Sequence, residues 1–292
     1  MNRFRFRFRF AWPFRQQFSA SPPPLATRWP FTGPSAAYVV TCVWHGIAIG
    51  GLAIAPSAWP YWLAGTAVNH AIVTFAGLWP RSSLLGANWT RLPQNVRTKH
   101  AIALTIDDGP DPRITPRVLD MLDEHGIRAS FFCIGARAAL YPDIVRDIVA
   151  RGHAVENHSQ RHRHTFSVSF GFSIAKEVAA AQTTLTALTG TSPAFFRAPA
   201  GLRNVFLDLV LQRADLRLAT WTRRGFDTRE GDAAVVAKKL IDGLRERDIL
   251  LLHDGSAAYT PNGEPVILLV LPLLAAAAKE QSLRFIMLRD AL

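Results

Sequence analysis

The stretch "LTIDDGPDP", residues 104–112, decides how the rest of the chain is interpreted. An apolar run that starts at Ala101 ends in two adjacent carboxylates, Asp107 and Asp108, and then breaks at a Gly-Pro pair. Two buried like charges repel each other and lose hydration, so both carboxylates would resist ionisation. Either the pair lies in a solvated loop, or a cation lies between the carboxylates and offsets the cost.

From residue 101 onward, short apolar runs alternate with helical patterns. The runs expected to form strands are 101–107, 128–135, 153–159, 194–199, 217–222, 248–254 and 283–288. Helices are expected near 115–125 with Thr115 as the cap, 142–151, 173–189 ending at Gly190, from Asn204, from Asp232 to about 245, and 264–281. Strands that alternate with helices predict βαβ units and a parallel sheet. Seven units favour a closed or nearly closed barrel of parallel strands, and an open doubly wound sheet is the alternative.

Polar side chains follow most of the predicted strands, at the point where each strand ends. The carboxyl ends of parallel strands meet at one edge of the sheet, where ligands bind in such folds. We therefore expect one site there. Its residues would be Asp107 and Asp108, His158, Arg197, Asp227 and His253.

The segment "ENHSQRHRH", residues 156–164, places His158 and His162 at positions i and i+4, which would share one face of a helix. Two histidines, one carboxylate and an open position make a catalytic zinc-type site, and Asp108 is the natural third ligand. The alternative is a solvated, histidine-rich loop. With the cation in place, Asp107 would accept a proton from an activated water, and Arg197 would keep Asp107 ionised.

His253, in "ILLLHDG", is the candidate general acid, because a histidine that titrates near neutrality can protonate a departing amine. The alternative is a structural histidine that is hydrogen-bonded to the loop at Asp254.

Four segments in order, "TIDDGPDP", "HSQRH", "RAPAG" and "LLLHDG", resemble the motif series of the metal-dependent polysaccharide deacetylases, which are carbohydrate N- and O-deacetylases. The resemblance covers residues of about 100–290. It implies a distorted (β/α)7 barrel and a divalent metal, preferably Zn²⁺, with Co²⁺ or Mn²⁺ as substitutes. The implied roles are Asp107 as base, Asp108, His158 and His162 as metal ligands, Arg197 as partner of the base, and His253 as acid.

The same resemblance implies that the backbone N–H of Ala200, in the Pro199–Gly201 turn, stabilises the oxyanion. Two departures from the family pattern bear on the substrate. Ala200 stands where the family often has an aromatic residue, and "WTRRGFDT" replaces the usual Asp-Trp pairing. We expect Asp227 to orient His253, and Trp221 to line the pocket.

The charge of the chain is distributed unevenly. Residues 1–100 hold ten Lys and Arg and no Asp or Glu, although the whole chain has 33 basic and 22 acidic residues. A nucleic-acid-binding enzyme would carry its positive charge on the folded domain. Here the charge flanks apolar sequence instead, which indicates a lipid bilayer as partner and argues against nucleic acid.

Two uncharged stretches, 36–56 and 60–80, have the length of membrane-spanning helices and would form an antiparallel hairpin. His45 and His70 would pack between the helices. Basic residues flank both ends, so the positive-inside rule places both ends in the cytoplasm, at a bacterial-type inner membrane. A signal peptide is the alternative. The expected organisation is a basic, Pro-rich, disordered leader (1–35), the hairpin (36–80), a linker (81–100) and a catalytic domain (101–292).

The sequence therefore predicts a membrane-anchored metal hydrolase that removes an N-acetyl group from a membrane-associated or cell-envelope saccharide. With the domain in the cytoplasm, a lipid-linked saccharide becomes the favoured substrate, and a deformylase of a lipid-linked amino sugar is a close variant. A different class, a non-catalytic glycan-binding membrane module, would keep the fold without the reaction.

Overall fold

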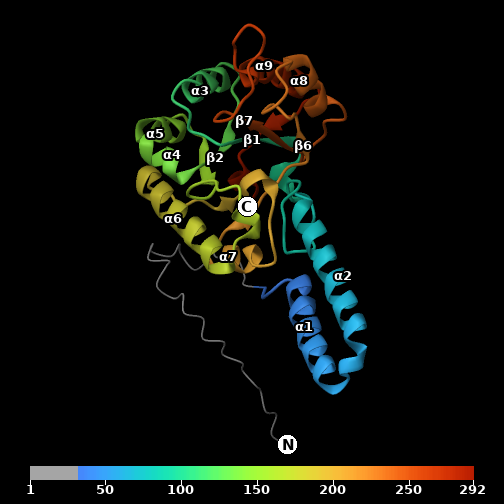
Figure 1. Ribbon diagram of the computed structural model, residues 1–292. Coiled ribbons are helices and arrows are strands. Elements are labelled where there is room, and N and C mark those ends of the chain that lie inside the picture. Colours follow the sequence, from blue (N-terminus) through green and yellow to red (C-terminus); the bar gives the residue numbers. More distant parts are fainter. Residues whose placement is uncertain (1–31) are drawn as a thin grey trace, which may run out of the picture.

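The computed structural model describes residues 32–292, so the "RFRFRFRF" run and most of the predicted leader lie outside the described residues. A pair of long helices precedes a domain of alternating strands and helices (Figure 1). The strands are β1 (Ala101–Asp107), β2 (Ala129–Cys133), β3 (Ala154–Asn157), β4 (Phe195–Phe196), β5 (Arg217–Leu218), β6 (Arg223–Arg224), β7 (Ile249–His253) and β8 (Arg284–Phe285). The α-helices are α1 (Ala36–Ile54), α2 (Trp59–Leu78), α3 (Thr115–Glu124), α4 (Gly135–Leu140), α5 (Pro142–Ala150), α6 (Gly171–Thr189), α7 (Leu207–Arg213), α8 (Ala233–Ile241) and α9 (Val266–Glu280).

The strands form one parallel sheet in the order β5-β4-β3-β2-β1-β7-β6, and β8 pairs with the first residues of β1. The described strands do not close into a full barrel, because no pairing joins β5 to β6. The architecture is a curled half-barrel, which corrects the expectation of a (β/α)7 barrel but keeps its parallel strands and outer helices.

Residues 89–92 fill part of the opening between the outer strands. Trp89 bridges to Ala219 just after β5, and Arg91 bridges to Asp248 just before β7. The Thr220 N–H donates to the Trp89 carbonyl at 3.0 Å, and the Leu92 N–H donates to the Arg247 carbonyl at 2.9 Å. A stretch expected to be a linker therefore pairs with the sheet.

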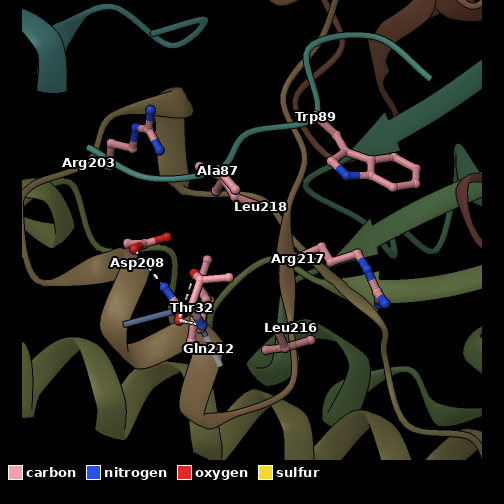
Figure 2. Close-up of a pocket in the computed structure, with 10 residues that line it drawn as sticks. Thr32, Ala87, Trp89, Arg203, Asp208, Gln212, Leu216, Arg217 and Leu218 are labelled. Atoms are coloured by element: carbon pink, nitrogen blue, oxygen red, sulfur yellow. Dashed lines mark hydrogen bonds between the residues drawn. The ribbon is translucent and has the colours of Figure 1, made fainter. Parts of the chain in front are cut away.

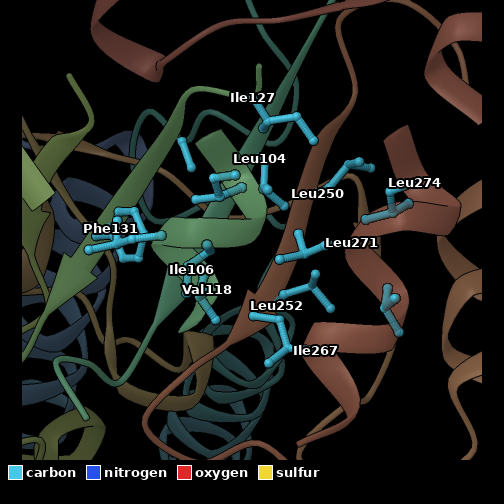
Figure 3. Packing of buried hydrophobic residues seen from close by; sticks show 14 of the residues in the cluster. Leu104, Ile106, Val118, Ile127, Phe131, Leu250, Leu252, Ile267, Leu271 and Leu274 are labelled. Atoms are coloured by element: carbon cyan, nitrogen blue, oxygen red, sulfur yellow. The ribbon is translucent and has the colours of Figure 1, made fainter. Parts of the chain in front are cut away.

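The main core lies between the sheet and the helices α3 and α9 (Figure 3). All seven residues of β1 are buried, as expected for a central strand covered on both faces. Leu104 and Ile106 face the helices and pack in the cluster with Phe131, Leu252 and Leu271. Side chains alternate along a strand, so Thr105 and Asp107 share the opposite, concave face of the sheet.

Several predicted helix boundaries agree with the structure. Helix α6 ends at Gly190 in the left-handed conformation, and Asp232 caps α8 by accepting from the Ala234 and Val235 N–H groups. The expected cap at Thr115 is wrong, because the Thr115 hydroxyl donates to Asp254 instead. Helix α7 begins at Leu207, not at Asn204. The predicted strand 217–222 ends after two residues, and β6 and α4 are additional elements.

The helices α1 and α2 lie antiparallel and project from the domain (Figure 1). Their polar side chains face each other: the Trp44 indole donates to Thr66 at 3.1 Å, and the His45 and His70 Nε2 atoms are 3.2 Å apart. No residue of α1 is buried, and most of its apolar side chains face outward.

Among the described residues, α1 is the one helix long and apolar enough to be a candidate membrane span, and a signal sequence near the N-terminus has the same character. The prediction of two spans is therefore not supported for α2. That helix carries Pro60, Thr66, Asn69 and His70, which lower its hydropathy.

Candidate metal centre and active site

The end of β1 presents its two carboxylates to different partners. Asp107 keeps the strand's alternation and points into the concave face, where it is almost fully buried. Asp108 has a φ of 73°, so its side chain leaves that alternation. Its Oδ1 lies 3.2 Å from His158 Nε2 and 3.3 Å from His162 Nε2. Asp107 Oδ2 lies 3.9 Å from His158 Nε2, so the two carboxylates share this imidazole, while Arg197 contacts Asp107 and His162 contacts Asp108.

The two histidines converge through a loop and not through a helix, which corrects the expected helical face. Ser159 and His162 both have positive φ values, 63° and 49°, and the Ser159 hydroxyl accepts from the His162 N–H at 3.1 Å. Glu177 of α6 fixes this loop by accepting from the Arg161 N–H and guanidinium, each at 2.9 Å. The turn brings the imidazoles together with ring centroids 4.8 Å apart.

The orientation of His158 suits a metal ligand. Its Nδ1 lies 2.8 Å from the Arg197 carbonyl oxygen, which only accepts, so Nδ1 carries the proton. In the neutral ring the Nε2 lone pair then points at Asp108. Hydrogen bonding of the other ring nitrogen to a carbonyl is typical of metal-ligating histidines.

The ionisation of the cluster also fits a cation. Burial alone would raise the pKa of Asp108, but the hydrogen bond and charge of His158, with the charges of His253 and His162, hold it well below its usual range. Burial, together with the charge of His158, lowers the pKa of His162 to about 4, which leaves that ring neutral at pH 7. Burial also opposes the charged form of His158, yet Asp107 and Asp108 raise its pKa.

One ligand atom each from Asp108, His158 and His162 lie within 4.8 Å of one another. Asp108 Oδ1 is buried and faces the Nε2 atoms of the two imidazoles, at 3.2 and 3.3 Å. One carboxylate oxygen and two imidazole nitrogens are a donor set suited to Zn²⁺, with a position left open. These residues therefore fit a divalent metal ion.

Arg197 holds Asp107 in place. The Arg197 side chain is completely buried, and its Nη1 donates to Asp107 Oδ1 at 2.7 Å and to Thr105 at 2.8 Å. Its other nitrogens donate to the carbonyl oxygens of Ala219 and Thr220. Arg197 and its acceptors form a buried network that fixes the position of the Asp107 carboxylate.

His253 is the last residue of β7, and the sheet register pairs it with Asp107 on β1. Both carboxylate oxygens of Asp227 contact His253. One lies 2.9 Å from His253 Nδ1, and the other accepts a hydrogen bond from the His253 backbone N–H at 2.7 Å. Burial lowers the pKa of His253, but the hydrogen bond and charge of Asp227 outweigh it, so the net direction is upward. This arrangement fixes the ring and favours its protonated form.

The turn expected to supply an oxyanion donor, Pro199–Gly201, is a single 3₁₀ turn, and Ala200 sits exposed at its apex with φ 54°. A Cβ on Gly201 would lie 2.6 Å from the Trp221 ring and 2.9 Å from Pro80, so only glycine fits. Trp221 is 8% exposed and lies against the Arg197 and Arg224 guanidinium groups. It supports the turn from beneath, and little of its face is open to a sugar.

Sequence reasoning missed three contributors to the site. The Ser256 hydroxyl donates to Asp108 Oδ2, and Arg137 donates to the Asp108 carbonyl at 2.6 Å. Gly255 lies against the same carbonyl, because a Cβ there would be 2.0 Å away. Ser256 and Gly255 directly follow His253 and Asp254, so the "HDGS" order was a usable signal, whereas nothing near Arg137 marks it.

A separate pocket lies beside α7 and contains none of the predicted site residues (Figure 2). Gln212 of α7 accepts from the Thr32 N–H at 3.0 Å and donates to the Gly33 carbonyl at 2.9 Å. Asp208 accepts from the Gln212 amide at 2.8 Å and fixes its orientation. These bonds fasten the residues that lead into α1 to the surface of the domain.

Comparison with known proteins places the chain among enzymes. The family model described as "Polysaccharide deacetylase" matches residues 94–219. A chitooligosaccharide deacetylase of Azorhizobium caulinodans is 34% identical over 169 residues, which cover 56% of this chain and 77% of that protein. The peptidoglycan-N-acetylglucosamine deacetylase PgdA of Listeria monocytogenes is 32% identical over 158 residues, 54% of this chain and 33% of that protein.

Solved structures with a similar fold belong to the same kind of enzyme. A peptidoglycan N-acetylglucosamine deacetylase superposes with a TM-score of 0.61 at 25% identity, covering 68% of this chain and 90% of that one. A family 4 carbohydrate esterase from Streptomyces lividans, solved with acetate, superposes with a TM-score of 0.57 at 27% identity, covering 63% and 91%. The chain belongs to the polysaccharide deacetylase family, whose members are hydrolases that act on N-acetyl amide bonds of carbohydrates.

Proposed function

We propose that this chain is a metal-dependent deacetylase, anchored at a membrane through α1, that removes the acetyl group from an N-acetylated amino sugar of an envelope saccharide. The observation that carries the proposal is the convergence of Asp108, His158 and His162 beside the paired Asp107 and His253. The organisation that goes with it is an N-terminal leader, a helical hairpin and a catalytic domain that begins near residue 101.

The residues divide the reaction between them. Asp108, His158 and His162 would hold the divalent ion, with Zn²⁺ favoured by the donor set. When bound, the ion supplies a Lewis acid that polarises the acyl oxygen and lowers the pKa of a water from 15.7 to about 7.

Asp107 accepts the proton of the water that attacks the acyl carbon, and the 2.7 Å hydrogen bond from Arg197 holds the Asp107 carboxylate in place. The N–H of Ala200, an exposed residue in the Pro199–Gly201 turn, donates to the oxygen that becomes negative. His253 delivers a proton to the sugar nitrogen as the C–N bond breaks, and Asp227 stabilises the charged imidazole. The products are an amine on the sugar and a free carboxylate.

The names of the relatives suggest the class of substrate. Chitooligosaccharides and peptidoglycan both carry N-acetylglucosamine, and this chain matches deacetylases of both kinds. The projecting, apolar helix α1 favours a saccharide that is presented at a membrane. A lipid-linked N-acetyl sugar is therefore included among the substrates to test.

The test is acetate release by the full chain in detergent from N-acetylglucosamine oligosaccharides, peptidoglycan fragments and a lipid-linked N-acetyl sugar. We expect release from at least one substrate, its loss in Asp107→Asn, and no change in Asp143→Asn, whose side chain is 93% exposed. A folded, metal-loaded protein that binds these glycans, releases no acetate from them and releases no formate from their N-formyl counterparts would instead favour a non-catalytic binding module.

A further inference from the structure

The segment between β3 and α6 carries a small apolar patch that the reaction does not explain. Three large side chains are exposed here: Val168 by 79% and Phe170 by 69% in this segment, and Phe172 by 54% in the first turn of α6. The rings of Phe170 and Phe172 are stacked, with centroids 6.4 Å apart and planes within 6°. We call these three residues the loop patch. Contiguous apolar groups of this kind at a surface mark an interaction site.

Basic side chains border the loop patch. Arg161, Arg163 and Lys176 are exposed and line a hollow together with Phe172. Glu177 is the one acidic side chain of that hollow, and it is buried beneath Arg161 and Arg163, with its Oε1 2.9 and 3.8 Å from their Nε atoms. The hollow therefore has a net positive charge and an aromatic rim.

The loop patch is continuous with the start of α1. A Cβ on Gly171 would lie 3.3 Å from Phe206, and the Phe206 ring contacts Tyr38 of α1 with centroids 6.4 Å apart. Gln212 of α7 fastens Thr32 and Gly33, which lead into α1, to the domain (Figure 2). Figure 1 shows that α1 begins and α2 ends at the domain, and that the turn between them lies farthest from it.

We propose that the loop patch and its basic border dock on the surface of an anionic bilayer, at the level where α1 enters the membrane. Aromatic side chains beside cationic groups suit the interface between acyl chains and anionic headgroups. The occupant is a lipid surface and not a protein, because the patch adjoins the one described helix with the character of a membrane span. This inference rests on the proposed insertion of α1 and not on the proposed reaction.

Docking in this way has a consequence for the site. The metal ligand His162 and the loop patch belong to the same segment, six residues apart at their nearest. The bilayer surface would then lie one loop away from the metal centre, which suits a saccharide attached to the membrane.

The test uses the full chain in nanodiscs of phosphatidylcholine and phosphatidylglycerol, with a polarity-sensitive fluorophore on one cysteine. Native Cys42 lies exposed on α1 and reports insertion, whereas Cys133 is buried. In a Cys42→Ser background, Phe170→Cys reports the loop patch, and Val168→Cys repeats the measurement should Phe170→Cys fail to fold. Leu269→Cys is the matched control, an exposed apolar position on α9 at the opposite end of the domain (Figure 1).

We expect headgroup-level nitroxide lipids to quench the label at 42 and at 170 or 168 at least twofold, and to leave the label at 269 unchanged. Quenching at 170 should decrease in discs of phosphatidylcholine alone and in Lys176→Gln. Quenching at 42 without quenching at 170 and 168 would overturn the docking and leave α1 inserted. No quenching at 42 would overturn the insertion, and the docking with it, while the deacetylase assay would stand apart.

Discussion

Asp107 and His253 lie directly opposite each other on the neighbouring parallel strands β1 and β7, so both side chains emerge on the same face of the sheet. Each is held by its own buried partner, Asp107 by Arg197 at 2.7 Å and His253 by Asp227 at 2.9 Å. The sheet register thus brings the proposed proton acceptor and the proposed proton donor together beside the Asp108, His158 and His162 cluster.

Replacing Asp227 with Asn should alter the pH dependence of the reaction. A general acid works only when protonated, so activity falls as the pH rises through the pKa of His253. Burial lowers that pKa and the hydrogen bond and charge of Asp227 raise it, with a net upward shift. The Asn variant loses the charge, so the alkaline limb of kcat should move to lower pH, and kcat at pH 7 should fall about 10²–10⁴-fold.

A pH profile of acetate release checks this prediction. Asp215→Asn, a change away from the site, serves as control and should keep the wild-type profile. An alkaline limb that stays in place in Asp227→Asn would remove His253 from the role of acid.

The His162→Ala and His164→Ala variants separate the metal ligand from its neighbour in the same loop. His162 belongs to the cluster of ligand atoms, whereas His164 is exposed and outside it. We expect purified His162→Ala to lose most of its bound zinc and its thermal stabilisation by added Zn²⁺, because a ligand that binds only the folded state raises its stability. His164→Ala should retain both. Equal zinc content in the two variants would contradict the assigned ligand set.

Arg197→Met should damage both stability and activity. Loss of this fully buried guanidinium leaves the Asp107 carboxylate unpaired in the interior, which costs about 3–5 kcal/mol. The exposed pair of Arg146 and Asp143 provides the control, and Arg146→Met should change the free energy of unfolding by less than about 1 kcal/mol. Thermal and denaturant unfolding of the full chain in detergent measures both. Similar losses in the two variants would show that Arg197 is not a buried structural partner.

Two glycine substitutions isolate the packing of the oxyanion turn. Gly190 and Gly201 have nearly the same φ, 69° and 73°, but a Cβ on Gly190 meets nothing within 4 Å. Gly190→Ala should cost about 1–2 kcal/mol for the left-handed backbone alone. Gly201→Ala should cost about 1–3 kcal/mol more, because its Cβ displaces Trp221 and Pro80. Equal losses of unfolding free energy in the two variants would mean that the Pro199–Gly201 turn shifts to accommodate the added Cβ without cost.

The sequence indicated the main strands, and the polar residues that converge at one edge of the sheet, because several strands end in an abrupt change of chemistry. β1 ends in two carboxylates and β7 in His253-Asp254, and a polar residue after a buried run has few structural explanations. A family resemblance then connected residues that are far apart in sequence. The same local signals located Gly190 and Asp232 as helix ends, since both act through their own neighbouring backbone.

What the sequence did not indicate depends on contacts between distant segments. The sequence of residues 89–92 does not predict that they pair with Ala219 and Asp248, because isolated bridges produce no periodic pattern of apolar residues. The i, i+4 spacing of His158 and His162 favoured a helix, but positive φ values at Ser159 and His162 achieve the same convergence in a loop. Arg137 reaches Asp108 across 29 positions, and its own neighbours give no hint of this.

The most direct test of the account is a zinc titration of the full chain after removal of its metal with a chelator, with acetate release as the readout. The account predicts that release stops in the stripped protein and returns in full at one equivalent of Zn²⁺. Asp107→Asn should bind the same equivalent and remain inactive, since Asp107 is not among the three ligands. Acetate release that survives complete metal removal, or an active Asp107→Asn, would contradict the account.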